Sequence, residues 1–330
     1  MKILYAIQGT GNGHISRAKE IIPVLKQYGE VDILVSGTQV DLSVNNSLQY
    51  RFRGVSFIFG KKGGVHRWKT YQSMNMAQFY RDMKSLPLKD YHLIINDFEP
   101  VCAWACRLQQ VDSVALSHQC AFVSPNTPRP LKKWNWEEFI FTYYAPTKYH
   151  VGLHFESYDD FIFTPIIRSD IREAVSRNLG HYTVYLPAYD DVRLMTYLRQ
   201  IPEISWEIFS KHQVTPYRYG NVQIKPIAAD SFTQSLVDCE GVITGGGFET
   251  PAEALFLGKK LLVIPMKYQY EQQCNAIALQ RLGIPSLATV GQHFVAEIRH
   301  WMMSDNVKKI SFPNRTEYLI KRLISDYAKN

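Results

Sequence analysis

Residues 241–253 of this 330-residue chain read GVITGGGFETPAE. A short apolar run ends in three glycines at 245–247, and a helical pattern begins at Thr250. A strand that turns through glycines into a helix directs several free backbone N–H groups at one point, and this arrangement suits a phosphate. The same glycines also suit an ordinary tight turn, because glycine accompanies many sharp changes of chain direction.

Short aliphatic or β-branched runs alternate with longer helical patterns, which is typical of βαβ units around a parallel sheet. The predicted strands form two series, one at 3–7, 31–35, 55–59, 93–95 and 114–116, the other at 183–186, 206–209, 222–224, 242–244 and 261–264. We therefore predict an α/β protein with two Rossmann-like, doubly wound domains that face each other across a cleft. The predicted linker is at 163–168. Ligands of such sheets bind beyond the carboxyl ends of the strands.

The length, composition and charge of the chain indicate a globular protein of a reducing compartment. The length exceeds the size at which one hydrophobic core usually keeps growing, and 46% hydrophobic with 20% charged residues is typical of a globular protein. The net charge of +7 favours an acidic partner, whether a nucleotide, an anionic lipid or a nucleic acid. Five cysteines without a CxxC pair favour a reducing compartment and argue against a zinc site. The apolar runs are too short for a signal peptide or a membrane span, so we expect a cytoplasmic protein.

The first predicted strand runs into residues 9–14, GTGNGH, and then into a helical stretch at 15–28. The glycines allow the backbone to approach a ligand, and His14 begins the helix at the predicted cleft. The segment differs from the dinucleotide fingerprint GxGxxG because His14 replaces the last glycine, and no acidic residue follows the second strand. A nicotinamide dehydrogenase is therefore disfavoured. His14 is a candidate catalytic base, or else a surface or capping residue.

The strand at 93–95 continues into LIINDFEP, which places Asp97 at its carboxyl end. A carboxylate there can accept the Nδ1–H of His14 and stabilise the imidazolium that forms when the ring takes a proton. Asp97 can equally cap the helix that begins near Pro100, and the two roles are compatible. Asp97 and Glu99 also form a DxE pair of the kind that binds divalent cations, but no partner cluster accompanies it.

Two further groups of polar residues follow predicted strands. His118 and Gln119 come after the strand at 114–116 and can hydrogen-bond a phosphate; alternatively, His118 is a buried histidine with satisfied partners. Residues 271–273, Glu-Gln-Gln, follow the strand at 261–264. A carboxylate and two amides suit a polyhydroxylated sugar, and they also suit a solvated helix start.

Two segments combine basic residues with aromatic rings or glycines. Residues 128–144, PRPLKKWNWEEFIFTYY, suit a membrane interface, an amphiphilic acceptor, or a packed helix with snorkelling lysines. Residues 60–70, GKKGGVHRWKT, suit a loop that closes over an anionic acceptor, or an ordinary exposed loop.

These features together resemble the GT-B glycosyltransferases. The similar branch includes the nucleotide-diphosphate-sugar glycosyltransferases of plants and the lipid-linked N-acetylglucosaminyltransferase of peptidoglycan synthesis. The motifs that carry the resemblance are the GxGH-type loop at 9–14, the proline-containing linker, the glycine loop at 245–247, Glu253, and Glu-Gln-Gln followed by Asn275 and Ala276. The layout is similar over the whole chain, and the C-terminal half carries the more specific match.

The resemblance implies the GT-B fold with three parts. Residues 1–165 form an N-terminal domain that binds the acceptor, and residues 166–314 form a C-terminal domain that binds the nucleotide sugar. A last helix at 315–330 packs back onto the N-terminal domain.

The resemblance also implies roles for individual residues. The residues around the diphosphate are Gly245, Gly246, Gly247, Phe248, Glu249 and Thr250. Glu253 binds the ribose, and Ile227 and Ala228 border the base. The transferred sugar contacts Glu271, Gln272 and Gln273. His14 matches the family's N-terminal histidine, and Asp97 matches the aspartate that supports it in the plant enzymes. The acceptor side comprises Thr10, Gly11, Asn12, Gly13, His118 and Gln119.

Two positions depart from the family pattern. The plant enzymes carry a histidine where Gly245 stands, so the backbone here must hold more of the diphosphate charge. Ile227 replaces the aromatic platform for the base, so the base need not be uridine, although a UDP-sugar is the leading expectation.

The resemblance implies an inverting, metal-independent glycosyltransferase that needs no cofactor. His14, oriented by Asp97, would deprotonate an acceptor hydroxyl, and the nucleotide diphosphate would leave into the glycine loop. The expected acceptor is lipid-linked or a cell-envelope glycan, with peripheral contact to an anionic membrane at its inner face. The alternatives are a nucleotide-sugar epimerase of the same fold and a non-catalytic nucleotide-sugar sensor. A nucleic-acid binder is disfavoured because the chain has no compact nucleic-acid motif.

Overall fold

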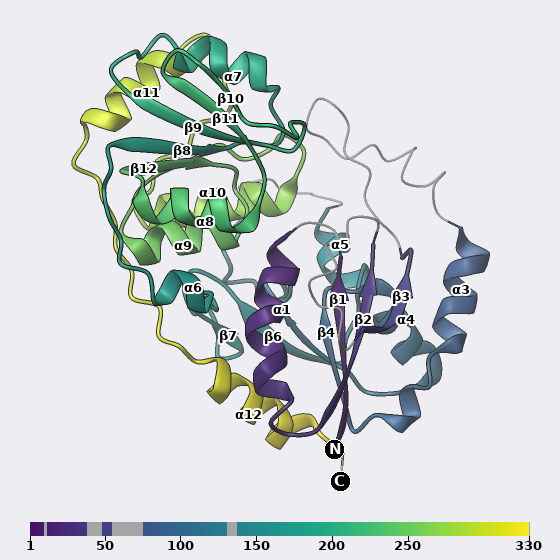
Figure 1. Ribbon diagram of the computed structural model, residues 1–330. Coiled ribbons are helices and arrows are strands. Elements are labelled where there is room, and N and C mark those ends of the chain that lie inside the picture. Colours follow the sequence, from purple (N-terminus) through teal and green to yellow (C-terminus); the bar gives the residue numbers. More distant parts are fainter. Residues whose placement is uncertain (10–11, 38–47, 55–74, 131–136, 330) are drawn as a thin grey trace.

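The computed structural model describes residues 1–9, 12–37, 48–54, 75–130 and 137–329. Figure 1 shows two sheets surrounded by helices, one from the first half of the chain and one from the second. The predicted strand at 55–59 and the basic loop at 60–70 lie outside the described residues.

Within the described residues, the N-terminal sheet has seven strands in the order β3-β2-β1-β4-β5-β6-β7, and neighbouring strands are parallel. Its strands are β1 (Lys2–Gln8), β2 (Glu30–Ser36), β3 (Leu48–Phe52), β4 (Leu93–Asp97), β5 (Val114–Ser117), β6 (Tyr149–Leu153) and β7 (Ile162–Phe163). The chain winds outward from β1 in both directions. The adjacent strands β1 and β4 therefore form the switch point at which such sheets bind ligands.

The C-terminal sheet repeats this arrangement, with six strands in the order β10-β11-β9-β8-β12-β13. Its strands are β8 (His181–Tyr185), β9 (Ser205–Ser210), β10 (Tyr217–Tyr219), β11 (Val222–Pro226), β12 (Gly241–Thr244) and β13 (Lys260–Val263). Only the β10–β11 pair is antiparallel among these described strands. Its switch point lies between β8 and β12, where the glycine loop begins.

Helices cover both faces of each sheet because successive side chains of the buried strands point to opposite faces. On one face of β1, Ile3, Tyr5 and Ile7 pack in a core with α1 (Asn12–Leu25) and α12 (Thr316–Tyr327), and on the other face Leu4 and Ala6 pack with α4 (Pro100–Gln109). The helices of the N-terminal half are α1 (Asn12–Leu25), α3 (Met76–Ser85), α4 (Pro100–Gln109) and α5 (Glu138–Tyr143), with 3-10 turns η2 (Leu88–Asp90) and η3 (Gln119–Val123). Those of the C-terminal half are α6 (Ser169–Arg172), α7 (Asp191–Leu198), α8 (Ala229–Asp238), α9 (Glu249–Leu257), α10 (Tyr270–Arg281), α11 (Phe294–Met303) and α12 (Thr316–Tyr327).

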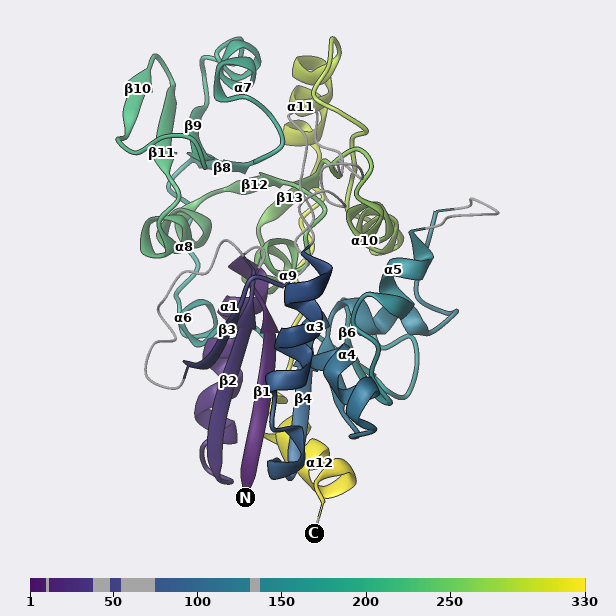
Figure 2. The same ribbon diagram turned by 90° about the vertical axis from the view of Figure 1, so that its right-hand side faces the viewer.

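The last helix, α12, lies against the N-terminal sheet although it follows the whole C-terminal half (Figures 1 and 2). Its Tyr327 ring stacks on Tyr149 of β6 with centroids 4.7 Å apart, and the Lys329 N–H donates to the His92 carbonyl over 2.9 Å. The chain therefore crosses between the two halves twice, once before α6 and once before α12.

The prediction of two doubly wound α/β units is confirmed, and nine of the ten predicted strands overlap observed ones. The sequence analysis did not predict β3, β6, β7 or β10. The polar and apolar residues of β3 (LQYRF) and β6 (YHVGL) are mixed, and β7 has two residues. Strands this short or this mixed carry little periodicity, so their pairing with a neighbouring strand defines them.

Candidate active site

The His14–Asp97 pair lies at the N-terminal switch point. Asp97 ends β4, His14 lies in the first turn of α1, and His14 Nδ1 is 2.8 Å from Asp97 Oδ1. The Asp97 side chain is fully buried, whereas that of His14 is 12% exposed. Burial opposes the charge of Asp97, but the Arg17 guanidinium and His14 outweigh it and lower the pKa of Asp97. An ionised carboxylate can only accept, so the Nδ1–H of His14 donates and Nε2 is left to take a proton.

Arg17, one turn after His14 on α1, joins this pair to the other domain. Its Nε lies 3.2 Å from Asp97 Oδ2, and its Nη2 lies 2.7 Å from Oδ1 and 2.8 Å from Oδ2. Its Nη1 donates to Glu249 Oε1 at the start of α9. The sequence analysis missed Arg17, although its spacing of three residues from His14 places both on one helix face.

Glu99, rather than Asp97, caps α4. Its Oε1 accepts from the Val101 N–H over 2.8 Å and its Oε2 accepts from the Cys102 N–H over 2.6 Å, while Ser36 Oγ donates to Oε1 over 2.5 Å. Burial raises the pKa of Glu99 to about 7, against the opposing effect of these donors. The two carboxylates of the DxE pair are thus directed at different partners. Within the described residues, no three His, Cys, Asp or Glu side chains are grouped so that they could hold a metal ion.

The glycine loop connects β12 to α9 and is held by α10. Gln272 Oε1 accepts from the Gly246 N–H over 3.1 Å and from the Met266 N–H over 3.0 Å, and Asn275 Nδ2 donates to the Gly246 carbonyl over 3.0 Å. A Cβ at Gly246 would lie 2.4 Å from the Gln272 carbonyl oxygen, so only glycine fits there. The Gln272 amide oxygen therefore faces the backbone of the loop. The first N–H groups of α9 have no carbonyl acceptor within the helix and leave a partial positive charge at its start.

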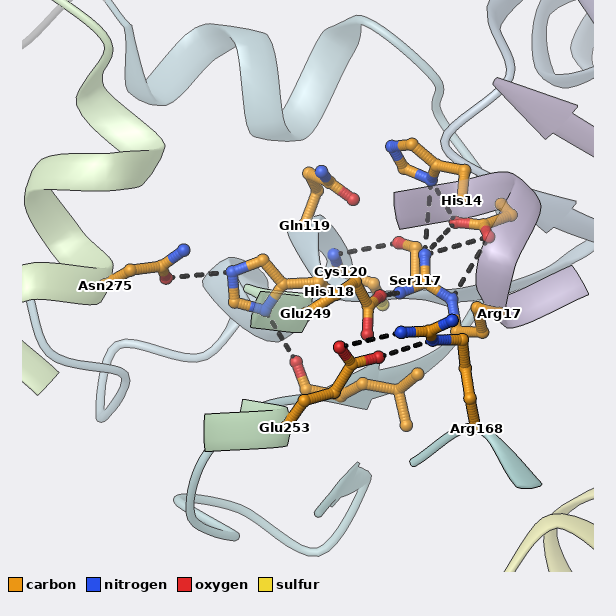
Figure 3. A network of polar contacts seen from close by, with 12 residues as sticks. His14, Arg17, Ser117, His118, Gln119, Cys120, Arg168, Glu249, Glu253 and Asn275 are labelled. Carbon is orange, nitrogen blue, oxygen red and sulfur yellow. Dashed lines mark hydrogen bonds and ion pairs between the residues drawn. The ribbon is translucent and has the colours of Figure 1, made fainter. Parts of the chain in front are cut away.

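Phe248 of this loop packs into the N-terminal domain. Its ring stacks on the buried His118 ring with centroids 4.0 Å apart and planes within 6°. His118 Nδ1 lies 2.8 Å from the Leu153 carbonyl, and Nε2 lies 2.8 Å from Asn275 Oδ1 (the latter contact is drawn in Figure 3), so both ring nitrogens contact protein oxygens. Burial lowers the pKa of His118. His118 thus lies within the contact between the domains.

The polar side chains of the α10 start and of η3 also meet across the domains. Gln119 Nε2 donates to Glu271 Oε2 over 3.2 Å, and Glu271 Oε1 lies 3.9 Å from His118 Nε2. Gln273 is half-buried on the first turn of α10. The structure therefore brings His118 and Gln119, which the sequence analysis assigned to the acceptor side, together with Glu271, which it assigned to the sugar.

Glu253, on the second turn of α9, is held by the linker. Arg168 Nε lies 2.6 Å from Glu253 Oε1 and Nη2 lies 3.1 Å from Oε2. Glu253 is 4% exposed, and burial raises its pKa while Arg168 opposes that effect. The sequence analysis did not single out Arg168, which lies at the end of the predicted linker.

The remaining predicted site residues lie after β11 and at the start of α1. Ile227 and Ala228 follow β11, where the Ile227 N–H donates to the Ser210 carbonyl over 3.2 Å and Ala228 precedes α8. Gly13 lies on the first turn of α1 and faces Glu249, since a Cβ there would be 3.0 Å from Glu249 Cγ. Asn12 is the first residue of α1, and Thr10 and Gly11 lie outside the described residues.

A cavity of about 650 Å³ lies beside this junction, in the N-terminal domain. Asn96 and Ser117, from the ends of β4 and β5, line it together with the aromatic side chains of Phe98, Phe122, Phe141 and Tyr143. Phe122 and Phe141 also pack against Tyr270 and Cys274 of α10. The sequence analysis did not predict the cavity, because the pattern of residues 96–150 does not show which of their side chains leave space between them. Of the aromatic stretch 128–144, residues 131–136 lie outside the described residues.

Comparisons with known proteins identify this arrangement as GT-B. A glycosyltransferase of Streptomyces nogalater, SnogD, is 14% identical with a TM-score of 0.56, and the match covers 100% of this chain and 96% of that one. MurG of Acinetobacter baumannii is 14% identical with a TM-score of 0.59 over 98% of this chain and 99% of that one. Arabidopsis thaliana UGT89C1, solved with UDP, is 12% identical with a TM-score of 0.59 over 98% and 94%. No curated protein sequence matches the chain.

The family follows from the sequence match. Residues 1–304 match the family model of glycosyl transferase family 1, which is most of the chain. The protein belongs to this family and is a GT-B glycosyltransferase. Among the described helices, none is long and apolar enough to cross a membrane.

Proposed function

We propose that this glycosyltransferase moves a sugar from a nucleotide-diphosphate sugar to an acceptor hydroxyl, with inversion and without a metal ion. The observation that carries the proposal is the junction of α1 with α9. The His14–Asp97 pair and the start of α9 belong to different domains, and Arg17 contacts both Asp97 and Glu249. An acid–base pair and an anion-favouring helix end therefore lie at one place.

The donor is proposed to bind with its diphosphate at the start of α9. The free N–H groups of the first helical turn and the helix dipole stabilise negative charge that develops on the leaving diphosphate. We propose that the ribose lies beside Glu253, whose carboxylate is paired with Arg168, and that residues 227–228 border the base, with the sugar near Glu271 and Gln273. The UDP bound to UGT89C1 supports UDP-sugar as the leading candidate donor.

His14 is proposed to be the general base. Its Nε2 removes the proton of the acceptor hydroxyl, and Asp97 stabilises the imidazolium through Nδ1. The activated oxygen attacks the anomeric carbon on the face opposite the leaving diphosphate. A single displacement of this kind inverts the anomeric configuration.

The N-terminal cavity is proposed to hold the body of the acceptor. It lies at the ends of β4 and β5, and its four aromatic side chains suit an apolar or amphiphilic molecule. A lipid-linked or cell-envelope acceptor has this character. Substitution of Phe98 by alanine should raise KM for the acceptor and leave donor affinity unchanged.

Peripheral membrane contact is proposed at α5. The Phe139 and Tyr143 rings stack with centroids 5.8 Å apart and are 54% and 51% exposed, and Tyr143 also lines the cavity. Exposed aromatic side chains beside a cavity suit an interface from which an amphiphilic acceptor enters. Less protein should sediment with anionic vesicles for a Phe139→Ser/Tyr143→Ser variant than for the wild type. If the wild type sediments equally with and without vesicles, the proposed membrane contact is wrong.

A donor panel tests the proposed reaction. UDP-, ADP-, GDP- and dTDP-sugars are offered with lipid and phenolic acceptors, nucleoside diphosphate release is measured, and the anomer of the product is read by NMR. We expect inverted product, activity that resists EDTA, and loss of activity in His14→Ala. Sugar isomerisation without an acceptor would indicate an epimerase, and donor binding without turnover would indicate a sensor.

A further inference from the structure

Glu249 has an unexpected orientation for a residue of the proposed diphosphate loop. It is the first residue of α9, yet its carboxylate accepts from Arg17 of the N-terminal domain (Figure 3). The Arg17 side chain is 2% exposed and that of Glu249 is 19% exposed. Gly13 leaves space for Glu249, because a Cβ at Gly13 would lie 3.0 Å from Glu249 Cγ. The pair is therefore a packed contact between the domains.

The carboxylates around Glu249 outnumber the basic side chains that are free to pair with them. The titratable groups that face it are Arg17 and His14 of α1, Asp97 of β4, Tyr5 of β1, Arg168 of the linker and Glu253 of α9. Arg168 is paired with Glu253, and Arg17 already contacts Asp97 through Nε and Nη2. Two carboxylates, Asp97 and Glu249, therefore share one arginine. Burial raises the pKa of Glu249 to about 7, with Arg17 opposing this effect and Glu253 and Asp97 adding to it.

A charged Glu249 competes with a bound diphosphate in two ways. Both anions favour the positive start of α9, and both favour the guanidinium of Arg17. Two anions in one poorly solvated site raise each other's proton affinity, so the group that can take a proton is expected to do so. A carboxyl group can be protonated near neutral pH, whereas the diphosphate diester of a nucleotide sugar cannot.

We propose that the Glu249 carboxylate is a stand-in for the donor diphosphate: without donor it holds Arg17 at the start of α9. When the donor binds, the negative charge of the diphosphate drives Glu249 to give up this contact. The carboxylate takes one proton from solvent on binding, becomes a neutral acid, and releases Arg17 Nη1 to the phosphate oxygens. Arg17 thereby supplies the cationic contact that the glycine loop lacks, and it does so from the opposite domain. This inference rests on the proposed function, because it requires a diphosphate at the start of α9.

Proton-linked binding is the direct test. The chain is titrated calorimetrically with UDP-glucose and UDP-N-acetylglucosamine at about pH 6 and about pH 8.5, in pairs of buffers with different ionisation enthalpies. Binding should take up close to one proton at the higher pH and almost none at the lower, because Glu249 is already protonated there. The number of protons taken up is measured on the wild-type protein, so this result holds even if a substituted variant folds poorly.

Glu249→Gln removes the titrating group and keeps its shape. At about pH 8.5, roughly 1.5 units above the pKa, the variant should bind the donor up to about thirtyfold more tightly than the wild type and take up no proton. Glu20→Gln is the matched control, because Glu20 lies on α1 and bonds Ser169 across the domains but does not face the loop. It should retain the wild-type proton count.

The outcomes separate this inference from the proposed function. If the wild type binds donor without proton uptake at the higher pH, or if Glu249→Gln binds no more tightly than the wild type, Glu249 is not a stand-in and the proposed function is unaffected. If neither the wild type nor Glu249→Gln binds any UDP-, ADP-, GDP- or dTDP-sugar, the proposed function fails and this inference fails with it.

Discussion

His14 Nδ1 lies 2.8 Å from Asp97 Oδ1, at the carboxyl end of a strand that neighbours the one leading into α1. The histidine keeps some exposure while the carboxylate has none. Such a pair fixes the ring tautomer and leaves Nε2 directed away from the carboxylate. Because Asp97 contacts the ring nitrogen that does not take the proton, substitution of Asp97 tests its role without removing the proposed base.

Asp97→Asn should lower kcat by about 10²- to 10⁴-fold, because an amide neither stabilises the imidazolium nor fixes its tautomer. The measurement is steady-state transfer kinetics with donor binding by calorimetry. If Asp97 acts through His14, the His14→Ala/Asp97→Asn double variant should be no slower than His14→Ala alone. Fully additive losses would contradict this assignment.

Acid stability should also depend on Asp97. Its pKa is lowered in the folded state, so its contribution is present above the unfolded value of about 3.9 and is lost as pH falls through the folded value. Urea unfolding from about pH 5 to about pH 2 should show a shallower decline in Asp97→Asn than in the wild type. Asp112→Asn is the control, since Asp112 is exposed and pairs with Lys148, and its decline should match that of the wild type.

Gly246→Ala should distort the glycine loop. The added Cβ would meet the Gln272 carbonyl oxygen at 2.4 Å, and relief of such a clash typically costs about 1–3 kcal/mol. Donor affinity should fall along with the midpoint of thermal unfolding. Gly247→Ala is a matched control in the same loop, because a Cβ there meets no described atom within 4 Å; equal destabilisation by both would contradict the packing argument.

Arg168→Gln should destabilise the protein by about 3–5 kcal/mol, because it leaves the Glu253 carboxylate buried without its partner. The measurement is chemical unfolding at neutral pH. Adding Glu253→Gln should recover much of the loss, since no unpaired charge then remains. Asp170→Asn removes the exposed partner of Arg168 and should change stability by less than about 1 kcal/mol.

Much of the site could be predicted because strand ends are visible in the sequence. Apolar runs indicate the buried strands, and in doubly wound sheets the residues that follow them share one edge. This reasoning placed His14 and Asp97 near each other and placed the glycine loop before a helix. It offered Asp97 as a cap of the helix near Pro100, and this was wrong, because the backbone geometry puts Glu99 at the N-cap of α4.

Contacts between the domains were not predictable in the same way. Nothing in the sequence pairs Arg17 with Glu249, which lie 232 positions apart, or stacks His118 on Phe248. Gln272 was expected to face a sugar, and the sequence did not show that its side-chain oxygen accepts from the Gly246 and Met266 N–H groups. Such partners are selected by proximity and by the need to satisfy buried polar groups.

The sequence by itself determined the two doubly wound α/β units, nine of their strands, and the glycine-rich start of α9, because these depend on local periodicity and on backbone freedom. The tertiary structure decided how the charges are shared: Arg17 between Asp97 and Glu249, and Arg168 on Glu253. Burial makes an unmatched charge costly, so the partner of each buried ion depends on which groups the fold brings within reach.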